Sequence, residues 1–381
     1  MSKSAIVVGA GIVGLATARA LAKRNYDVTV IERSGRAVGA SIRNFGMVWP
    51  IGQPGGELYE RAMLSRSIWK NICDETKMWY DTVGSLHLAY SSEEAHVLEE
   101  ISETLSYRDY EFLMPDQVIK KSEAVIYKDL KAGLCSTDEM IVDPRTAIAT
   151  IPRWLQEKFG VQFIWGKTIT DVAYPCVYSA KETWEADEIY ICSGADFETL
   201  YPEIYSSLLI TKCKLQMMRI QAQPGNWRIG PALCGGLSLL HYQSFKAALS
   251  LEVLKKKMTA EMSEYLKWGI HVMVSQNKEG ELTIGDSHEY GLTHDPFDKH
   301  FINQMILDYL AKFAHFKNEK IIESWNGTYA KASDGKAEII IQPEPGVIII
   351  NGLGGAGMTL SFGLCEQVIG EQLKKSLRVV K

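Results

Sequence analysis

A glycine-rich turn lies directly after the first apolar run of the chain, and it constrains the fold more than any other feature. The apolar run covers residues 5–8, and the turn carries Gly9, Gly11 and Gly14 in the spacing Gly-x-Gly-x-x-Gly. In a dinucleotide-binding unit the first glycine permits the tight turn, and the second lets the backbone approach a pyrophosphate. The third allows the helix to pack closely on the strand. We therefore predict a β-strand, a glycine turn and an α-helix here.

Glu32 supports a nucleotide-binding role for this unit. It ends the next apolar run, residues 28–31, about 20 residues after the turn, where a carboxylate accepts hydrogen bonds from ribose hydroxyls. The first turn of the helix also offers unpaired N–H groups and partial positive charge to phosphates. A purely structural glycine turn is the alternative, but the strand, the helix and the acid together favour a bound dinucleotide.

The composition narrows the class of protein. The chain has 381 residues, enough for two domains, and its net charge of −5 gives no support for a nucleic-acid partner. Seven scattered cysteines without a Cys-x-x-Cys pair are typical of reduced intracellular thiols. We see no basic leader, and no apolar run approaches the roughly 20 residues that span a bilayer. We expect a cytoplasmic protein without integral membrane segments.

The apolar pattern predicts an α/β fold with an insertion. Buried-strand composition recurs at 188–191 and 347–351, and each run precedes glycines. Alternating runs predict an antiparallel sheet near 214–222, 270–275 and 281–286. Helices are expected within 56–83, 92–106, 115–122, after Pro144, and within 296–316 and 359–375. We assign residues 1–84, 141–214 and 323–381 to a discontinuous nucleotide-binding domain and residues 85–140 and 215–322 to a substrate domain.

Five segments spread over most of the chain form a set with a fixed order. They are Gly9–Gly14 with Glu32-Arg33, residues 39–47, Asp143-Pro144, Ser193-Gly194-Ala195 and residues 354–361. This set resembles the FAD-dependent D-amino-acid and glycine oxidase (DAO) family, which includes the sarcosine oxidases. The resemblance implies FAD as cofactor and a Rossmann-like domain of the glutathione-reductase type.

The resemblance also implies which residues contact FAD. Residues 39–47 would wrap the phosphates and the flavin edge, and the C-terminal glycine turn would meet the pyrimidine side of the ring. The implied cofactor-binding residues are Gly9, Gly11, Ile12, Val13, Gly14, Glu32, Arg33, Ser41, Arg43, Asn44, Gly46, Met47, Val172, Ser193, Gly194, Gly354, Gly355, Ala356, Gly357, Met358 and Thr359.

The C-terminal glycine turn makes chemical sense for a flavin. Reduction leaves negative charge near N1 and the C2 carbonyl of the ring. A helix that starts beyond these glycines would direct N–H groups and a positive dipole end at that charge, and Thr359 could cap it. A turn with purely structural glycines is the alternative.

One departure from the family concerns the acid group of the substrate. Glycine and D-amino-acid oxidases typically carry Gly-x-Arg-Pro-x-x-x-Asp, and the arginine binds the α-carboxylate through two hydrogen bonds. Here Gly327 and Asp334 are kept, but Tyr329 replaces the arginine and Ala330 the proline. Because tyrosine cannot supply a cation, we expect the acid group to be bound by other residues.

The candidate catalytic residues are Arg43, His241, Tyr242, Tyr329 and Lys331, with Arg219 as a further cation. We expect His241 and Tyr242 on a strand, where neighbouring side chains point to opposite faces, so that only one lines the pocket. A surface histidine beside a buried tyrosine is the alternative. For Arg43, the alternatives are a salt bridge or an FAD phosphate contact.

Three evenly spaced histidines do not predict a metal site. His288, His294 and His300 are six residues apart, a spacing that suits no helical ligand pair. We expect them to be exposed or structural, and we predict no metal.

Residues 43–54 and 241–245 resemble a family subgroup that is associated with phosphonate catabolism. This implies hydride transfer to the flavin from a small aminophosphonate, such as 2-aminoethylphosphonate or an N-alkyl derivative, which yields an aldehyde and an amine or ammonia. A tetrahedral dianion such as a phosphonate is bound better by several separate hydrogen-bond donors than by one planar guanidinium group.

Other functions stay open. Within the same class, a glycine-, sarcosine- or D-amino-acid-type oxidase or dehydrogenase is the alternative. In other classes, the alternatives are a non-catalytic FAD-binding redox or interaction module and a nicotinamide-dependent dehydrogenase. The electron acceptor would be oxygen or a quinone or other carrier.

Overall fold

The predicted strand, glycine turn and helix form at the start of the chain. A computed structural model describes residues 2–379, with side chains described up to residue 371. Strand β1 (Ser4–Val8) leads through Gly9 into helix α1 (Ile12–Ala22), and the chain returns in strand β2 (Asp27–Glu32), parallel to β1. Four of the five residues of β1 are buried, which is typical of a strand with helices or sheets on both faces.

This unit is the centre of a six-stranded sheet. In spatial order the strands are β20 (Ile339–Glu344), β21 (Val347–Asn351), β13 (Glu188–Ile191), β1, β2 and β9 (Gln162–Trp165). All neighbours are parallel except β20, which runs antiparallel to β21 at one edge. The carboxyl ends of the parallel strands therefore meet at one edge of the sheet, where ligands bind in open α/β folds.

A nine-stranded, mainly antiparallel sheet forms the second half of the molecule. It contains β18 (Glu289–Gly291), β14 (Ile210–Ile220), β17 (Leu282–Gly285), β16 (Met273–Gln276), β15 (Ala232–Cys234), β5 (Ser85–Ala89), β7 (Ala132–Ser136) and β6 (Tyr110–Leu113) in this order, with β19 (Ile321–Ala332) paired to β14. One neighbouring pair, β5 with β15, is parallel.

Two small sheets complete the strands. One consists of β10 (Asp171–Ala173), β11 (Cys176–Ser179) and β12 (Glu182–Glu185), and the other of β3 (Met47–Val48), β8 (Met140–Val142) and β4 (Tyr80–Asp81).

The remaining helices are α2 (Glu57–Thr76), α3 (Ser92–Thr104), α4 (Pro115–Lys121), α5 (Pro144–Phe159), α6 (Pro202–Ser207), α7 (Leu237–His241), α8 (Leu251–Glu261), α9 (Ser263–Lys267), α10 (His300–Leu310) and α11 (Gly357–Val379). Short 3₁₀ helices are η1 (Ala40–Ile42), η2 (Pro50–Gly52), η3 (Gln243–Ala247) and η4 (Gly354–Ala356).

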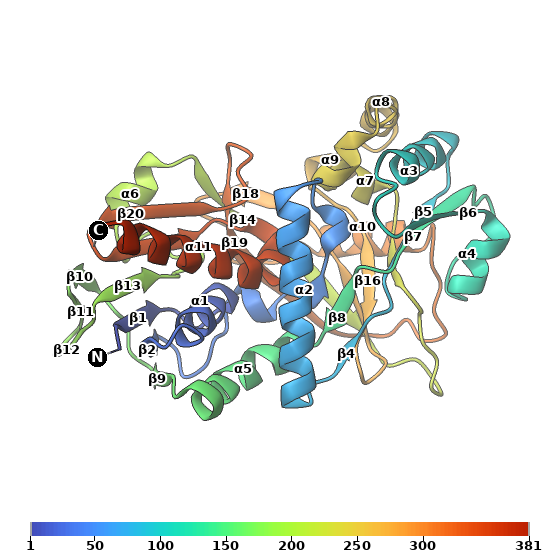
Figure 1. Cartoon of the computed structure of the whole chain (residues 1–381). Coiled ribbons are helices and arrows are strands. Elements are labelled where there is room, and N and C mark those ends of the chain that lie inside the picture. Colours follow the sequence, from blue (N-terminus) through green and yellow to red (C-terminus); the bar gives the residue numbers. More distant parts are fainter. Residues whose placement is uncertain (1, 380–381) are drawn as a thin grey trace.

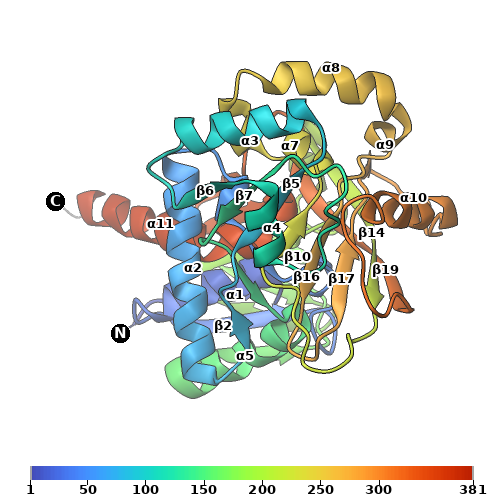
Figure 2. The same cartoon turned by 90° about the vertical axis from the view of Figure 1, so that its right-hand side faces the viewer.

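The helices cover the two sheets differently. Helices α1, α11 and α5 lie over one face of the parallel sheet, and α2 stands between the two halves (Figure 1). In the turned view, α3 and α8 lie along the top of the large sheet, with α10 at its side (Figure 2). Apolar residues of α1, α11 and the parallel sheet form one core cluster, and the large sheet with its helices forms another.

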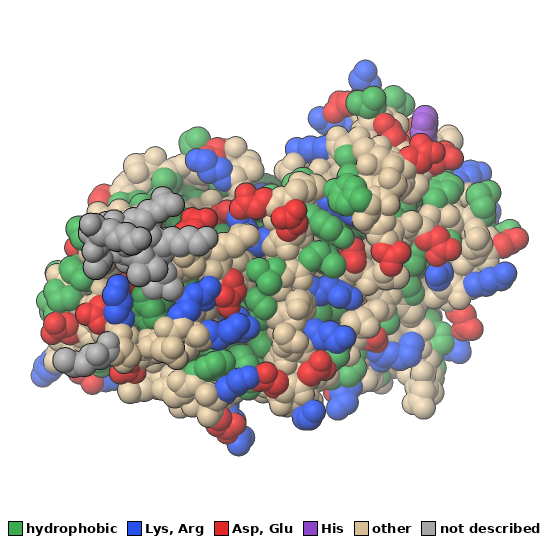
Figure 3. Space-filling model, viewed as in Figure 1, with side chains coloured by type: hydrophobic (Ala, Val, Ile, Leu, Met, Phe, Trp, Pro, Cys, Tyr) green, Lys and Arg blue, Asp and Glu red, His purple; other side chains and the backbone are tan. Residues whose placement is uncertain are grey.

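The surface carries both signs of charge. On the face shown in Figure 3, Lys and Arg side chains alternate with Asp and Glu side chains over both halves. Among the described residues, every helix is too short or too polar to cross a membrane.

The predicted fold class, a Rossmann-like domain with an inserted antiparallel sheet, is confirmed. The exact domain boundaries stay a prediction. The pairing of β19 differs from the predicted boundary at residue 323. It pairs with β14 along its length, so residues 323–332 lie in the large sheet rather than in the parallel one. The helix expected at 296–316 is shorter, because α10 covers only His300–Leu310.

Candidate active site

A cavity of about 750 Å³ lies between the two sheets. Its walls come from the carboxyl ends of β1, β2, β13 and β21, and from residues of β14, β16 and β19 in the large sheet. Ligand pockets typically measure roughly 300–1,000 Å³, so this volume is that of a small-molecule or cofactor site.

The glycine turn shapes one end of the cavity. Gly9 has φ +103°, and a Cβ on Gly14 would lie 1.9 Å from the Gly9 carbonyl oxygen, so α1 packs directly on the turn. Gly11 and Ile12 line the cavity at the helix N-terminus, where N–H groups attract anions. Ser41 Oγ accepts a hydrogen bond from the Ile12 N–H at 2.9 Å and joins the turn to η1.

Glu32, the last residue of β2, accepts hydrogen bonds that fix the glycine turn. Its Oε2 accepts from Ala10 N at 2.9 Å and its Oε1 from Ser34 N at 3.0 Å. Each carboxylate oxygen keeps a second lone pair, and Glu32 is part of the cavity wall, so a ribose hydroxyl can still bind. Arg33 Nη1 lies 2.7 Å from Asp196 Oδ2, and this ion pair joins two wall segments.

The segment after η1 is held by Asn44. Its amide donates to the carbonyls of Ala40 and Ser41, and its Oδ1 accepts from Gly46 N. Asn44 and Met47 line the cavity. Gly46, at φ +75°, packs against the Val142 carbonyl behind the wall.

The C-terminal glycine turn lies at the same cavity. Gly354, Gly355, Ala356, Gly357, Met358 and Thr359 line it, and α11 begins at Gly357, two residues earlier than expected. Thr359 does not have the expected capping role, since its Oγ1 accepts from Trp49 N at 2.9 Å and ties α11 to the segment after β3. The positive end of the α11 dipole therefore faces the cavity.

Some of the other predicted cofactor residues line the cavity, and the rest lie elsewhere or pack behind its wall. Val13, Ser193 and Gly194 line the cavity. Val172 is placed differently, in β10 of a small sheet, and the nearby wall is built from residues 167–169. Gly14 and Gly46 act behind the wall, where they permit close packing.

The opposite end of the cavity holds the candidate catalytic residues. Tyr329 and Lys331 are two positions apart on β19, so both side chains face the cavity. Lys331 Nζ lies 3.1 Å from the Tyr290 hydroxyl, and Arg43 Nη1 donates to the Asn326 carbonyl at 3.1 Å. Burial holds the pKa of the Tyr329 phenol well above its usual value, so Tyr329 is a neutral donor.

The expectation for His241 and Tyr242 was wrong. His241 ends the short helix α7 and Tyr242 follows it, so the strand rule for opposite faces does not apply. Both side chains line the cavity, and the Tyr242 hydroxyl lies 3.1 Å from Met273 Sδ. Arg219 is buried on β14, where it pairs with Glu281 away from the cavity.

The prediction for His288 needs a correction as well. His288 is buried and lines the cavity, together with His271 and Asp286, which the sequence analysis did not select. His294 and His300 lie outside the cavity wall. Both residues lie inside the alternating runs 270–275 and 281–286 that predicted an antiparallel sheet, and in the structure their backbones hydrogen-bond to each other.

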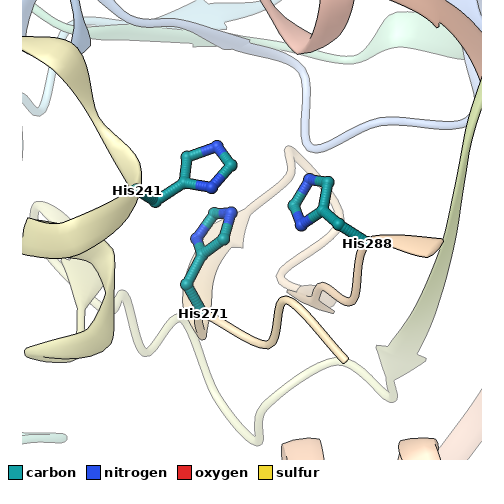
Figure 4. Close-up of side chains that lie close together, drawn as sticks. All are labelled: His241, His271 and His288. Atoms are coloured by element: carbon teal, nitrogen blue, oxygen red, sulfur yellow. The ribbon is translucent and has the colours of Figure 1, made fainter. Parts of the chain in front are cut away.

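Three imidazoles gather at this end. The ring centroids of His241 and His271 are 3.8 Å apart, those of His271 and His288 5.0 Å, and those of His241 and His288 4.8 Å. They come from three separate segments and face one another across a small gap (Figure 4). Burial lowers the pKa of the His271 and His288 rings, that of His288 to about 4, so these two rings are neutral at neutral pH.

Together, the parallel sheet, the two glycine turns and the covering sheet define a dinucleotide-binding flavoprotein. The chain belongs to the DAO family, whose model, described as "FAD dependent oxidoreductase", matches residues 4–369. The protein is therefore an FAD-dependent enzyme. The residues present fit FAD, since Gly9 and Gly11 of the turn, the Glu32 carboxylate and the N-terminus of α11 line one continuous cavity.

Known proteins are similar over different lengths. A D-amino acid dehydrogenase of Helicobacter pylori is 22% identical over 255 residues, which are 51% of this chain and 61% of that protein. The chain thus matches less than two thirds of that relative's length.

Solved structures cover nearly the whole chain. Glycine oxidase from Geobacillus kaustophilus has a TM-score of 0.78 at 18% identity and covers 98% of this chain and 95% of its own. The dithionite-reduced L-α-glycerophosphate oxidase from Mycoplasma pneumoniae, with FAD bound, has a TM-score of 0.72 at 17% identity. The match covers 97% of this chain and 94% of that protein's chain. At these identities the likeness shows the fold.

Proposed function

We propose that this enzyme oxidises the C–N bond of a small amine that carries an acidic group, best an aminophosphonate such as 2-aminoethylphosphonate or its N-alkyl derivative. The observation that carries the proposal is the set of donors around Tyr329. Two cations, Arg43 and Lys331, and two neutral phenols, Tyr242 and Tyr329, line the same cavity. Several point donors suit a tetrahedral dianion better than a planar carboxylate.

Each of these side chains has a defined task in this proposal. Arg43 uses one N–H on the Asn326 carbonyl, which fixes the guanidinium and leaves other N–H groups for the acid group. Lys331 Nζ donates a hydrogen bond to the Tyr290 hydroxyl, which fixes the position of the ammonium group. Bound FAD supplies the hydride acceptor. The chain itself binds the acid group and orients the α-carbon, which is the main contribution that proteins make to such reactions.

A second candidate is a glycine-, sarcosine- or D-amino-acid-type activity. The observation that favours it is the similarity to D-amino acid dehydrogenase and glycine oxidase. It requires Arg43 or Lys331 to bind a carboxylate in place of the missing arginine. The glycerophosphate oxidase, by its name, acts on a phosphate-bearing substrate and supports the first candidate.

Anaerobic mixing with matched substrates separates the two candidates. The purified yellow holoenzyme is mixed with 2-aminoethylphosphonate, its N-methyl form, glycine, sarcosine and D-alanine, and the oxidised-flavin absorbance is followed. We expect fast bleaching by the phosphonates alone. Bleaching by the carboxylates would overturn the phosphonate assignment. If none of them bleaches a flavin that dithionite reduces normally, the amine-oxidation proposal itself is wrong for these substrates.

We also propose oxygen or a quinone or other carrier as electron acceptor, and a cytoplasmic location. The seven cysteines are free thiols, which supports a reducing compartment. Oxygen consumption compared with reduction of a soluble quinone, at matched substrate turnover, identifies the acceptor. Fractionation of cells that express the tagged protein tests the location, and recovery in an oxidising compartment would contradict it.

A further inference from the structure

The three histidines at the substrate end of the cavity have a buried carboxylate beside them. Asp286 Oδ1 lies 3.2 Å from His271 Nε2, and Oδ2 lies 3.8 Å from His288 Nε2. The side chains of these three residues are at most 8% exposed. Candidate ligand atoms of His241, His271 and His288 all lie within 4.8 Å of one another.

Several of these buried polar atoms are unsatisfied. Within the described part of the chain, His271 Nδ1 has no hydrogen-bond partner. His271 Nε2 and Asp286 Oδ1 have none either, since they lie 3.2 Å apart but are not aligned for a hydrogen bond to each other. Leaving a buried polar group unpaired costs free energy, and the cost is larger for a charged group. Unpaired atoms on neighbouring side chains that border a cavity therefore point to a bound species that is shared between them.

His288 shows which species fits. Its Nδ1 lies 2.9 Å from the Gly269 carbonyl oxygen, which can only accept, so Nδ1 carries the proton. Nε2 then presents a lone pair toward Asp286 Oδ2, and two acceptors that face each other repel unless a proton or a metal cation lies between them. A backbone carbonyl that fixes one ring nitrogen while the other binds an ion is the usual arrangement around metal-bound histidines.

We propose that His241, His271 and His288, with Asp286, bind one divalent transition-metal ion of the zinc class in the wall of the substrate cavity. Imidazole nitrogens with a carboxylate select such ions over magnesium or calcium, which prefer oxygen ligands.

The geometry requires small side-chain movements. Ligand nitrogens about 2.0–2.1 Å from a tetrahedral zinc ion lie closer to each other than 4.8 Å. The rings of His271 and His288 are also nearly parallel, at 9°, so their lone pairs do not yet converge. His271 can rotate without breaking a hydrogen bond to any described residue, while His288 stays on Gly269.

Three imidazoles and Asp286 fill the four positions of a tetrahedral ion, so an open position requires the ion to become five-coordinate. All four side chains line the cavity from which a fifth ligand would enter. The ring of His288 lies 6.5 Å from that of Tyr329, centroid to centroid, beside the position where the family arginine is missing. An oxyanion in the open position would meet a cation that the neutral imidazoles cannot provide. This last step rests on the proposed function, while binding of the ion does not.

Metal content of the holoenzyme tests the site directly. The protein is dialysed against EDTA, loaded with Zn²⁺, desalted and analysed for zinc and FAD. We expect one zinc per chain at unchanged FAD content, and at least a tenfold loss of zinc affinity in His271→Gln and His288→Gln. His241→Gln changes the least buried of the three rings and keeps the test valid if the other variants do not fold.

His300→Gln, on the exposed start of α10, is the matched control and should bind zinc as the wild type does. Zinc that is absent from the desalted wild type, or equal in the wild type and all three site variants, would overturn the proposal. The cluster would then be a hydrogen-bonded network in which a proton is shared between Asp286 and the rings.

A spectroscopic measurement tests the open position. Co²⁺-loaded holoenzyme is titrated with methylphosphonate, and the cobalt d–d bands on the long-wavelength side of the flavin are followed. We expect the bands to shift in the wild type. Unchanged bands would show a closed site and overturn the open position. Because neither readout needs turnover, an unreactive amine would count against the proposed function and not against the ion site.

Discussion

At the scale of single residues, the side chains at the substrate end of the cavity are of two kinds, neutral phenols and cations. Tyr329 and Tyr242 are neutral phenols whose burial raises the pKa well above its usual value, and Arg43 and Lys331 supply the positive charge. An acid group that enters the cavity therefore depends on these two cations. Truncating either one should affect binding of the substrate more than binding of FAD.

Arg43→Met tests this division. A hydrogen bond to a charged group contributes about 1.5–3 kcal/mol, so KM for the acidic amine should rise roughly 10- to 100-fold while FAD content stays constant. Arg36→Met, at an exposed position outside the cavity, is the matched control. Loss of FAD with an unchanged KM in the remaining holoenzyme would show that Arg43 serves the cofactor instead.

Glu139 should make stability depend on pH. It is fully buried, accepts from Ile51 N and Ser85 Oγ at 2.9 Å each, and burial raises its pKa to about 7 from an ordinary 4.5. Between these two values the folded protein keeps a proton that the unfolded chain releases. The free energy of unfolding therefore falls as pH rises from about 4.5 to 7, by up to about 3 kcal/mol from this group.

Glu139→Gln removes the titration; its amide oxygen can still accept from Ile51 N, while its NH₂ group donates to Ser85 Oγ, which now accepts. Urea midpoints of the wild type and the variant, measured at pH 5 and pH 8, should show the variant gaining relative stability at the higher pH. A difference that is the same at both pH values would contradict the assignment to Glu139.

At the scale of elements, close packing of α1 on the glycine turn sets the position of its N-terminus. A Cβ at residue 14 would lie 1.9 Å from the Gly9 carbonyl oxygen, so the helix can only keep its place with glycine there. Helix α11 depends in a similar way on the hydrogen bond between Thr359 and Trp49 N. Both helix ends face the cavity, and their positions decide where N–H groups meet the cofactor.

Gly14→Ala should displace α1 from the turn. Overpacking of this kind costs about 1–3 kcal/mol, and FAD affinity should fall at least tenfold because the N-terminus moves away from the cavity. Gly35→Ala is the control, since a Cβ there meets open space among the described atoms. Equal FAD dissociation constants in the two variants, measured by flavin fluorescence, would refute the role of close packing.

The elements were predictable from the sequence where one local pattern decides them. The strand, turn and helix around Gly9–Gly14 follow from apolar period and glycine spacing, and they are confirmed. Helix α7 was missed because its five residues are too few to show a period, and the nearby strands favoured a strand there. His271 and Asp286 were missed because their proximity depends on hairpin register, which composition does not encode.

At the scale of the whole molecule, the cavity joins the parallel sheet to the large sheet. A ligand that fills it contacts both halves and binds only where they are assembled. FAD should therefore stabilise the folded protein as a whole, by about 2.7 kcal/mol when free FAD is at 100 times its dissociation constant.

Thermal unfolding with increasing FAD measures this linkage. The midpoint of the reconstituted protein should rise with the logarithm of FAD concentration and should shift for probes of both halves together. Riboflavin, which lacks the pyrophosphate, should raise the midpoint much less. A midpoint that does not depend on FAD would show that the cavity walls form independently of the cofactor.

The wall of the cavity begins at Val8 and includes Leu360. During synthesis the glycine turn at Gly9–Gly14 is made long before the turn at Gly354–Gly357, which lines the same cavity. The cofactor site therefore stays incomplete until the second turn has been made. Loading of FAD consequently has to wait for this distant segment, and the first turn alone offers the cofactor only part of its site.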